Sequence, residues 1–231
     1  MVVGISRSMK ALYLLQQGDR LTRAEFERRF DATPDLKRAE LIEGVVYLPP
    51  AVSHDDHGGP HARIIMWLGN YCVATPNTDF GDNGSLRLDL KNMPQPDGYL
   101  LVRPDCGGQA RFENGYVSGG PELIVEVSAS SVSIDMHAKK EIYRRNGVKE
   151  YLVCRVFDGA FDWFVLEGGE YVELQDRDGV FDSTVFPGLR LDAKALLTGD
   201  LPGVQQSLNE ALALPEHTKF VTELQNRKTK A

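Results

Sequence analysis

The feature that most constrains the fold is a strand, a helix and a second strand that follow one another in the middle of the chain. Residues 122–128, "ELIVEVS", are apolar enough for a buried strand with an acid near its end. A helix is predicted over residues 134–146, with Gly147 as its stop, and the strand "KEYLVCRV" follows. A helix that crosses between two strands indicates a sheet covered by helices.

Strands and helices on both sides of this unit follow from local patterns. Thr22 and Glu25 form a capping-box pattern before a helix that has Phe26 and Phe30 on one face. Pro60 suits the start of a second helix, whose predicted apolar face consists of Ile64, Ile65, Leu68 and Tyr71. Strands are predicted at residues 45–47, 85–90 and 98–102 and, as a hairpin through two glycines, at "DWFVLE" and "EYVEL". This order predicts an α/β or α+β domain around a mixed sheet.

The length of 231 residues suits one domain with additions at both ends. We assign residues 1–20 to an N-terminal extension, 21–200 to the domain, and 201–231 to a C-terminal helix (204–214) with a polar tail, "NRKTKA". No apolar run reaches the roughly 18 residues of a membrane span, and the N-terminal apolar stretch is too short for a signal peptide. The three cysteines share no ligand spacing, which indicates reduced thiols in a cytoplasmic protein.

The formal net charge of −7 excludes one kind of nucleic-acid-binding protein, the kind that holds its target through bulk positive charge. A nucleic-acid partner would have to be held by a local basic patch, by a bound cation, or by both. Arg144, Arg145 and Lys149 could contact phosphates, although a solvated helix face accounts for them better.

Two acids are candidates for a metal site. Asp97 begins one predicted strand and Glu126 lies late in another, and carboxylates at the ends of neighbouring strands can converge on one point. Hard oxygen ligands of this kind are what Mg²⁺ prefers. A second Pro-Asp pair places Asp105 in front of "CGG", which is typical of a turn, so we choose Asp97. The alternatives are a turn residue after proline and, for Glu126, an exposed strand charge like the one expected for Glu122.

A lysine often follows the strand acid of a metal-dependent nuclease by two residues, but Ser128 stands at that position. The next helix offers Lys139 instead, on the same face as Tyr143. Because this helix directly follows the strand, its first turns, capped by Ser133 or Asp135, can lean back over the strand's end. We expect Lys139 in front of the two acids, with a solvated helix face as the alternative.

Several short pieces of the chain occur together in an order and spacing that are known from one family. They are "AELIEGVVYLPP", His57-Gly58 before a helix, "QPDGYLL", "ELIVEVSASS", "DMHAKKEIYRRNGVKEY" and "FPGL". With these pieces the chain resembles, from about residue 21 to residue 197, the Uma-two family of restriction endonucleases, a branch of the PD-(D/E)XK nuclease superfamily. The resemblance implies a restriction-endonuclease-like fold, with a mixed central sheet flanked by helices, and hydrolysis of phosphodiester bonds in DNA.

The resemblance also implies residue roles. Asp97, Glu126 and the backbone carbonyl of Val127 are expected to bind Mg²⁺ or Mn²⁺, and Lys139 to orient the attacking water or to offset charge on the phosphate. Glu40, in the Glu-Leu-Ile signature, is implied as an acid that helps hold the metal or its water. The alternatives for Glu40 are an exposed helix-end charge and replacement by its neighbour at position 43. A homodimer is implied as well.

The chain departs from the family pattern at two places. Gly98 and Tyr99 stand where the family is more often aliphatic, and "SASSVSID" lacks the proline and the basic residues that are frequent there. The second departure removes positive charge from the expected path of DNA.

Two other functions compete with the nuclease. The loop His54-Asp-Asp-His57, with His61, has ligand types of a zinc or HD-type hydrolase. However, Gly58-Gly-Pro60 separates His57 from the predicted helix, so the two histidines need not share a face, and no H-E-x-x-H pattern occurs. The other alternative is a nuclease fold retained as a binding or assembly module without catalysis, which the acidic net charge favours.

Overall fold

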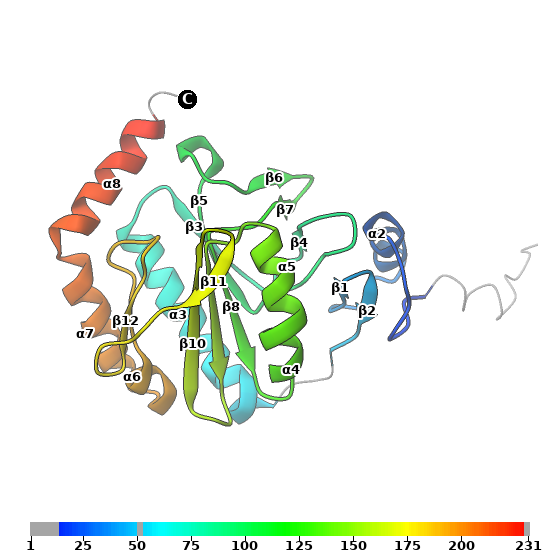
Figure 1. Cartoon of the computed structure of the whole chain (residues 1–231), viewed down its shortest axis with the longest axis horizontal. Coiled ribbons are helices and arrows are strands. Elements are labelled where there is room, and N and C mark those ends of the chain that lie inside the picture. Colours follow the sequence, from blue (N-terminus) through cyan, green and yellow to red (C-terminus); the bar gives the residue numbers. More distant parts are fainter. Residues whose placement is uncertain (1–13, 50–52, 229–231) are drawn as a thin grey trace, which may run out of the picture.

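The computed structural model describes residues 14–49 and 53–228, and its centre is a six-stranded sheet with helices on both faces (Figure 1). From edge to edge the strands are β11 (Glu170–Glu173), β10 (Ala160–Glu167), β9 (Glu150–Arg155), β8 (Leu123–Ser128), β5 (Gly98–Val102) and β3 (Thr78–Asp82). Strands β8 and β9 pair in parallel, and the other neighbours in this sheet pair antiparallel. The prediction of a mixed central sheet flanked by helices is confirmed.

The parallel strands are joined by the predicted crossover helix. It consists of α4 (Val132–Ile134), a π-helical turn (Asp135–Lys139) and α5 (Lys140–Arg145). Gly147 follows with a φ of 73°, a left-handed conformation that glycine adopts without strain. The expected caps were wrong: Ser131 occupies the N-cap position, and Asp135 lies inside the helix, where it accepts a hydrogen bond from Ser128.

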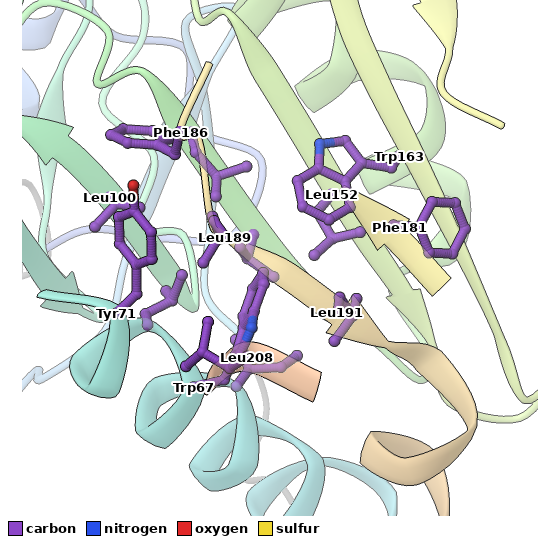
Figure 2. Packing of buried hydrophobic residues seen from close by; sticks show 14 of the residues in the cluster. Trp67, Tyr71, Leu100, Leu152, Trp163, Phe181, Phe186, Leu189, Leu191 and Leu208 are labelled. Carbon is purple, nitrogen blue, oxygen red and sulfur yellow. The ribbon is translucent and has the colours of Figure 1, made fainter. Parts of the chain in front are cut away.

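Each face of the sheet carries its own apolar core. Alternate residues of β8 point to opposite faces, as expected for a strand: Val125 belongs to the cluster under α3 (Gly59–Ala74), and Ile124 to the cluster under α5. Figure 2 shows the α3-side cluster, in which Trp67 meets Trp163 edge to face with ring centroids 6.1 Å apart. Two buried layers on one sheet hold the strand ends, and the residues on them, in place.

Helix α3 begins earlier than the sequence indicated. A π-helical turn (His54–Gly58) continues directly into it, and the Ser53 hydroxyl caps this turn by accepting a hydrogen bond from the Asp56 N–H at 3.1 Å. The expectation that the glycines separate His57 from the helix was wrong, because Gly58 adopts an ordinary helical φ of −60°. Trp67 was missed from the buried face of this helix, whereas Ile65 is only half-buried.

Smaller sheets and one helix lie around the main sheet. Helix α2 (Arg23–Asp31) begins after Thr22, whose hydroxyl accepts a hydrogen bond from the Glu25 N–H at 3.4 Å, and Phe26 stacks on Phe30. The small-sheet strands are β1 (Glu40–Ile42) with β2 (Val45–Tyr47), β4 (Leu86–Arg87) with β7 (Tyr116–Ser118) and β6 (Arg111–Glu113), and β12 (Val180–Asp182) with β13 (Arg190–Asp192). The strand predicted at residues 85–90 is thus much shorter. The strands that were not predicted are β1, β3, β6, β7, β12 and β13.

Three helices complete the described chain: α6 (Ala193–Thr198), α7 (Leu201–Leu212) and α8 (Pro215–Lys228). The prediction of one C-terminal helix followed by a polar tail was wrong as far as residue 228, because α8 occupies that part. Leu208 of α7 and Leu224 of α8 are buried in the α3-side core. Residues 1–13 of the extension and 229–231 of the tail lie outside the described residues. No helix of the described part is both long and apolar enough to cross a membrane.

Candidate active site

Asp97 and Glu126 meet at one end of the sheet because β5 and β8 run antiparallel. Gly98, the first residue of β5, pairs with Val125, so the residue before β5 lies beside the end of β8. There Oδ2 of Asp97 accepts a hydrogen bond from the Val127 N–H at 2.8 Å. The two acids are only 4% and 2% exposed, so neither is a solvated turn or strand charge.

Lys139 reaches this pair from the crossover helix. Its Nζ lies 3.0 Å from Oε1 of Glu126 and 2.9 Å from Oε1 of Glu40. The Tyr143 hydroxyl, one turn further along, donates a hydrogen bond to the same Glu126 oxygen at 2.7 Å. Lys139 is the last residue of the π-helical turn, a local widening that often occurs at functional sites. The expected shared face of Lys139 and Tyr143 is therefore present, and it faces Glu126.

Burial and the neighbouring charges together set the pKa values of Glu126 and Lys139. Burial raises the pKa of Glu126 well above its usual value, and the charges of Asp135 and Asp97 raise it further, against the opposing effect of Lys139. For Lys139 burial alone would lower the pKa, but Glu126 and Glu40 raise it well above the usual value of a lysine. The surrounding acids thus favour the charged form of Lys139.

Asp97 is held in its ionised form by its neighbours. Burial works against ionisation, but the hydrogen bond and charge of His57, together with the Val127 N–H and Lys139, keep its pKa below the usual value. Nε2 of His57 lies 3.1 Å from Oδ1 of Asp97, and Nη2 of Arg38 lies 3.4 Å from the same atom. One oxygen of Asp97 thus faces the Val127 N–H and the other faces two basic side chains.

Glu40 and its neighbour Glu43 have different surroundings. Glu40 is 8% exposed at the start of β1, where Oε1 also accepts a hydrogen bond from the Gln95 N–H at 2.8 Å. It is not an exposed helix-end charge. Glu43 lies in the turn after β1 and pairs with Arg145.

A pocket of about 300 Å³ brings these groups together. Asp97, Glu126, Val127, Lys139 and Glu40 all line it. Two basic side chains that were not predicted as part of the acidic site, Arg38 and His57, also line the pocket. His57 was quoted only as a family-matching residue and as part of a zinc alternative, and no local pattern singled out Arg38.

The basic residues suggested as weak phosphate contacts lie outside this pocket. Arg144 pairs with Glu141 at 2.8 Å, Arg145 pairs with Glu43, and Lys149 lies 3.7 Å from Glu122. None of the three is among the residues that line the pocket. The structure therefore does not bring them together with the acids.

Glu122 and Asp105, the two other acids considered from the sequence, both lie outside the pocket. Glu122 was expected to be solvated, but it is 1% exposed because it accepts hydrogen bonds from the Val102 and Gln109 N–H groups, both at 3.0 Å. Asp105 lies in a 3₁₀ turn, as its sequence indicated, where it is 3.5 Å from Arg103 and does not line the pocket.

The donor set suits a hard cation held by few protein ligands. Within residues 14–49 and 53–228, no three histidine, cysteine or acidic side chains are arranged so that they could hold a metal ion. Asp97 and Glu126 contribute carboxylate oxygens to the pocket, and Val127, with its backbone carbonyl, lines it as well. Oxygen ligands of this type are what Mg²⁺ prefers. The rings of His57 and His61 are 5.5 Å apart, but their Nε2 atoms contact the side chain and the backbone carbonyl of Asp97.

The mixed sheet with its helices is a nuclease-like fold. The chain belongs to the Uma2 family, described as "Putative restriction endonuclease", whose model matches residues 23–194. Its fold is similar to the crystal structure of "a putative nuclease belonging to DUF820 from Anabaena variabilis ATCC 29413", with a TM-score of 0.53 and 13% sequence identity. That match covers 69% of this chain and 90% of the other and concerns the fold alone. No curated protein matches the chain.

Proposed function

We propose that the protein is a metal-dependent endonuclease that hydrolyses phosphodiester bonds, with DNA as its substrate. One observation carries the proposal: Lys139 of the crossover helix, Glu126 of β8 and Asp97 before β5 line the same pocket. Membership of the Uma2 family and the nuclease-like fold support it.

In this proposal Asp97, Glu126 and the Val127 carbonyl hold Mg²⁺ or Mn²⁺. When bound, the metal supplies a Lewis acid that polarises the phosphate and lowers the pKa of the attacking water. Lys139 and Tyr143 fix Glu126 through Oε1, and within the described residues no hydrogen bond occupies Oε2. That oxygen is thereby available to a ligand.

Lys139 has the charge and the position to act on the reacting groups. Its ammonium orients the attacking water or offsets the negative charge that develops on the phosphate. Glu40 accepts from both Lys139 and the Gln95 N–H, so it holds the ammonium in the pocket. His57 and Arg38 in turn contact Oδ1 of Asp97 and hold this carboxylate in the pocket.

The test is cleavage of plasmid and single-stranded DNA by the purified protein in Mg²⁺, in Mn²⁺ and in EDTA. We expect metal-dependent cleavage by the wild type, loss of cleavage in Asp97→Ala and Glu126→Ala, and full cleavage by the control Asp105→Ala. If the wild type cuts no better than the first two variants, the protein is not this enzyme, and a binding or assembly module is the better account.

We also propose a homodimer, on the strength of the family resemblance. Light scattering coupled to size-exclusion chromatography would measure the mass in solution, and a monomer at micromolar concentration would contradict the proposal.

A further inference from the structure

A large aromatic side chain stands exposed at the rim of the pocket. Phe157 is 68% exposed, and it lines the same pocket as Asp97, Glu126 and Lys139. An exposed phenyl ring beside a phosphodiester-cleaving site is a surface on which a nucleic-acid base can stack.

The turn that carries Phe157 is held in a fixed place relative to the acids. This turn joins β9 to β10, and Arg155 on one side of it binds Asp162 at 2.5 Å and also pairs with Asp158. The Val156 N–H donates to the Ser128 carbonyl at 3.0 Å, which ties the turn to the end of β8. Because Ser128 is two residues from Glu126, the turn that carries Phe157 is tied to the strand that carries the acid.

The charges around the pocket do not suit a duplex held by its backbone. The basic side chains that line the pocket are Arg38, Lys139 and His57. Lys139 is only 5% exposed and lies between two carboxylates. Proteins that hold duplex DNA through phosphates use many such contacts. The binding energy at this pocket must therefore come largely from another source, and stacking on an aromatic ring is the source that the pocket offers.

We infer that the pocket takes one unpaired nucleotide of the substrate, with its base stacked on Phe157 and its phosphate near Arg38. The inference rests on the proposed function and adds the substrate class: single-stranded nucleic acid, or an unpaired stretch within a duplex. A volume of about 300 Å³ suits one small ligand group. The Arg38 side chain is 32% exposed and lines the pocket, so its guanidinium can donate to a phosphate oxygen there.

Binding in EDTA tests the inference separately from cleavage. Fluorescence anisotropy with a labelled 12-nucleotide single-stranded DNA would compare the wild type with Phe157→Ala, Phe157→Trp and the control Phe112→Ala, a ring that is 50% exposed outside the pocket. We expect the Kd to rise about 5- to 150-fold in Phe157→Ala, because stacking contributes roughly 1–3 kcal/mol per base. Phe157→Trp and Phe112→Ala should bind like the wild type.

A second arm identifies the stacked base. One abasic nucleotide is moved along the oligonucleotide, and at one position it should weaken wild-type binding as much as Phe157→Ala does. In Phe157→Ala the same abasic site should cost nothing more, because the two changes remove the same contact. Single-stranded RNA and blunt duplex DNA of the same sequence complete the series, and the duplex should bind most weakly of the three.

Three results would overturn the inference: equal affinity of wild type and Phe157→Ala, duplex binding as tight as single-strand binding, or a change of solution mass in Phe157→Ala, which would assign the ring to an interface between two copies. Cleavage without any effect of Phe157→Ala removes the inference and leaves the nuclease. Stacking-dependent binding without cleavage by the wild type removes the nuclease and leaves the single-strand site.

Discussion

The Lys139 ammonium lies 3.0 Å from the Glu126 carboxylate, although the two residues belong to different elements of the fold. Ser128, which stands where a nuclease lysine often follows the strand acid, is fully buried and donates a hydrogen bond at 2.5 Å to Asp135. Asp135 is the residue one turn before Lys139 on the crossover helix. The serine thus ties that helix to the strand end and places the lysine in front of Glu126.

Replacement of Ser128 by alanine should destabilise the protein. It leaves a buried carboxylate oxygen of Asp135 without its donor, and the other oxygen already has no hydrogen bond within the described residues. We expect the free energy of unfolding to fall by about 1–3 kcal/mol, measured by urea denaturation. The exposed Ser130→Ala is the matched control and should change it by less than about 0.5 kcal/mol. Equal effects of the two changes would contradict this role.

Mn²⁺ should stabilise the folded protein in the absence of any substrate. A cation that binds only the folded state raises the free energy of unfolding by about 2.7 kcal/mol at 100 times its Kd. Thermal unfolding with increasing Mn²⁺ should therefore show a rising Tm for the wild type and for Asp105→Ala, and a constant Tm for Asp97→Ala. A rise of the same size in Asp97→Ala would place the cation elsewhere.

Glu150 should give the stability a specific pH dependence. Burial raises its pKa, although Ser183, Thr184 and the Val185 N–H donate hydrogen bonds to it. In the unfolded state the pKa of a glutamate is about 4.3, so the folded state keeps this proton to a higher pH. The contribution of Glu150 to the free energy of unfolding is therefore largest below about pH 4.3. It falls as the pH rises to the raised pKa of the folded state.

The matched variant for this effect is Glu150→Gln, which has no proton to lose. The difference in unfolding free energy, wild type minus variant, should decrease from pH 4 upward and then become constant once the folded carboxyl has ionised, as measured by denaturation at a series of pH values. A difference that stays constant or increases over that range would contradict the assignment.

The sequence predicted those elements whose cause is local. Strand β5, strand β8, the β10–β11 hairpin and the crossover helix follow from apolar runs, glycines and helical spacing, and the structure contains them. The meeting of Asp97 with Glu126 also depends only on antiparallel pairing of two strands that were both recognised.

The features that were mispredicted depend on distant partners. Glu122 can be buried because backbone N–H groups from two other segments donate hydrogen bonds to it. No local sequence pattern predicts these donors. Arg38 reaches Asp97 across 59 residues of sequence. Two consecutive glycines usually indicate the end of a helix, but the turn before α3 is helical because Ser53 caps it. Helix α8 is polar on most of its surface and is held by the burial of Leu224 against the domain.

The central claim is that the crossover helix supplies the lysine of a nuclease site, and one rate comparison tests it most directly. Single-turnover cleavage of single-stranded DNA in saturating Mn²⁺ would be measured for wild type, Lys139→Met and Lys140→Met, at a temperature at which circular dichroism shows all three folded. Lys140 is the matched control, because its ammonium lies over the Phe164 ring and outside the pocket. We predict a fall of about 100- to 1,000-fold for Lys139→Met and an unchanged rate for Lys140→Met. Equal rates for wild type and Lys139→Met would contradict the claim.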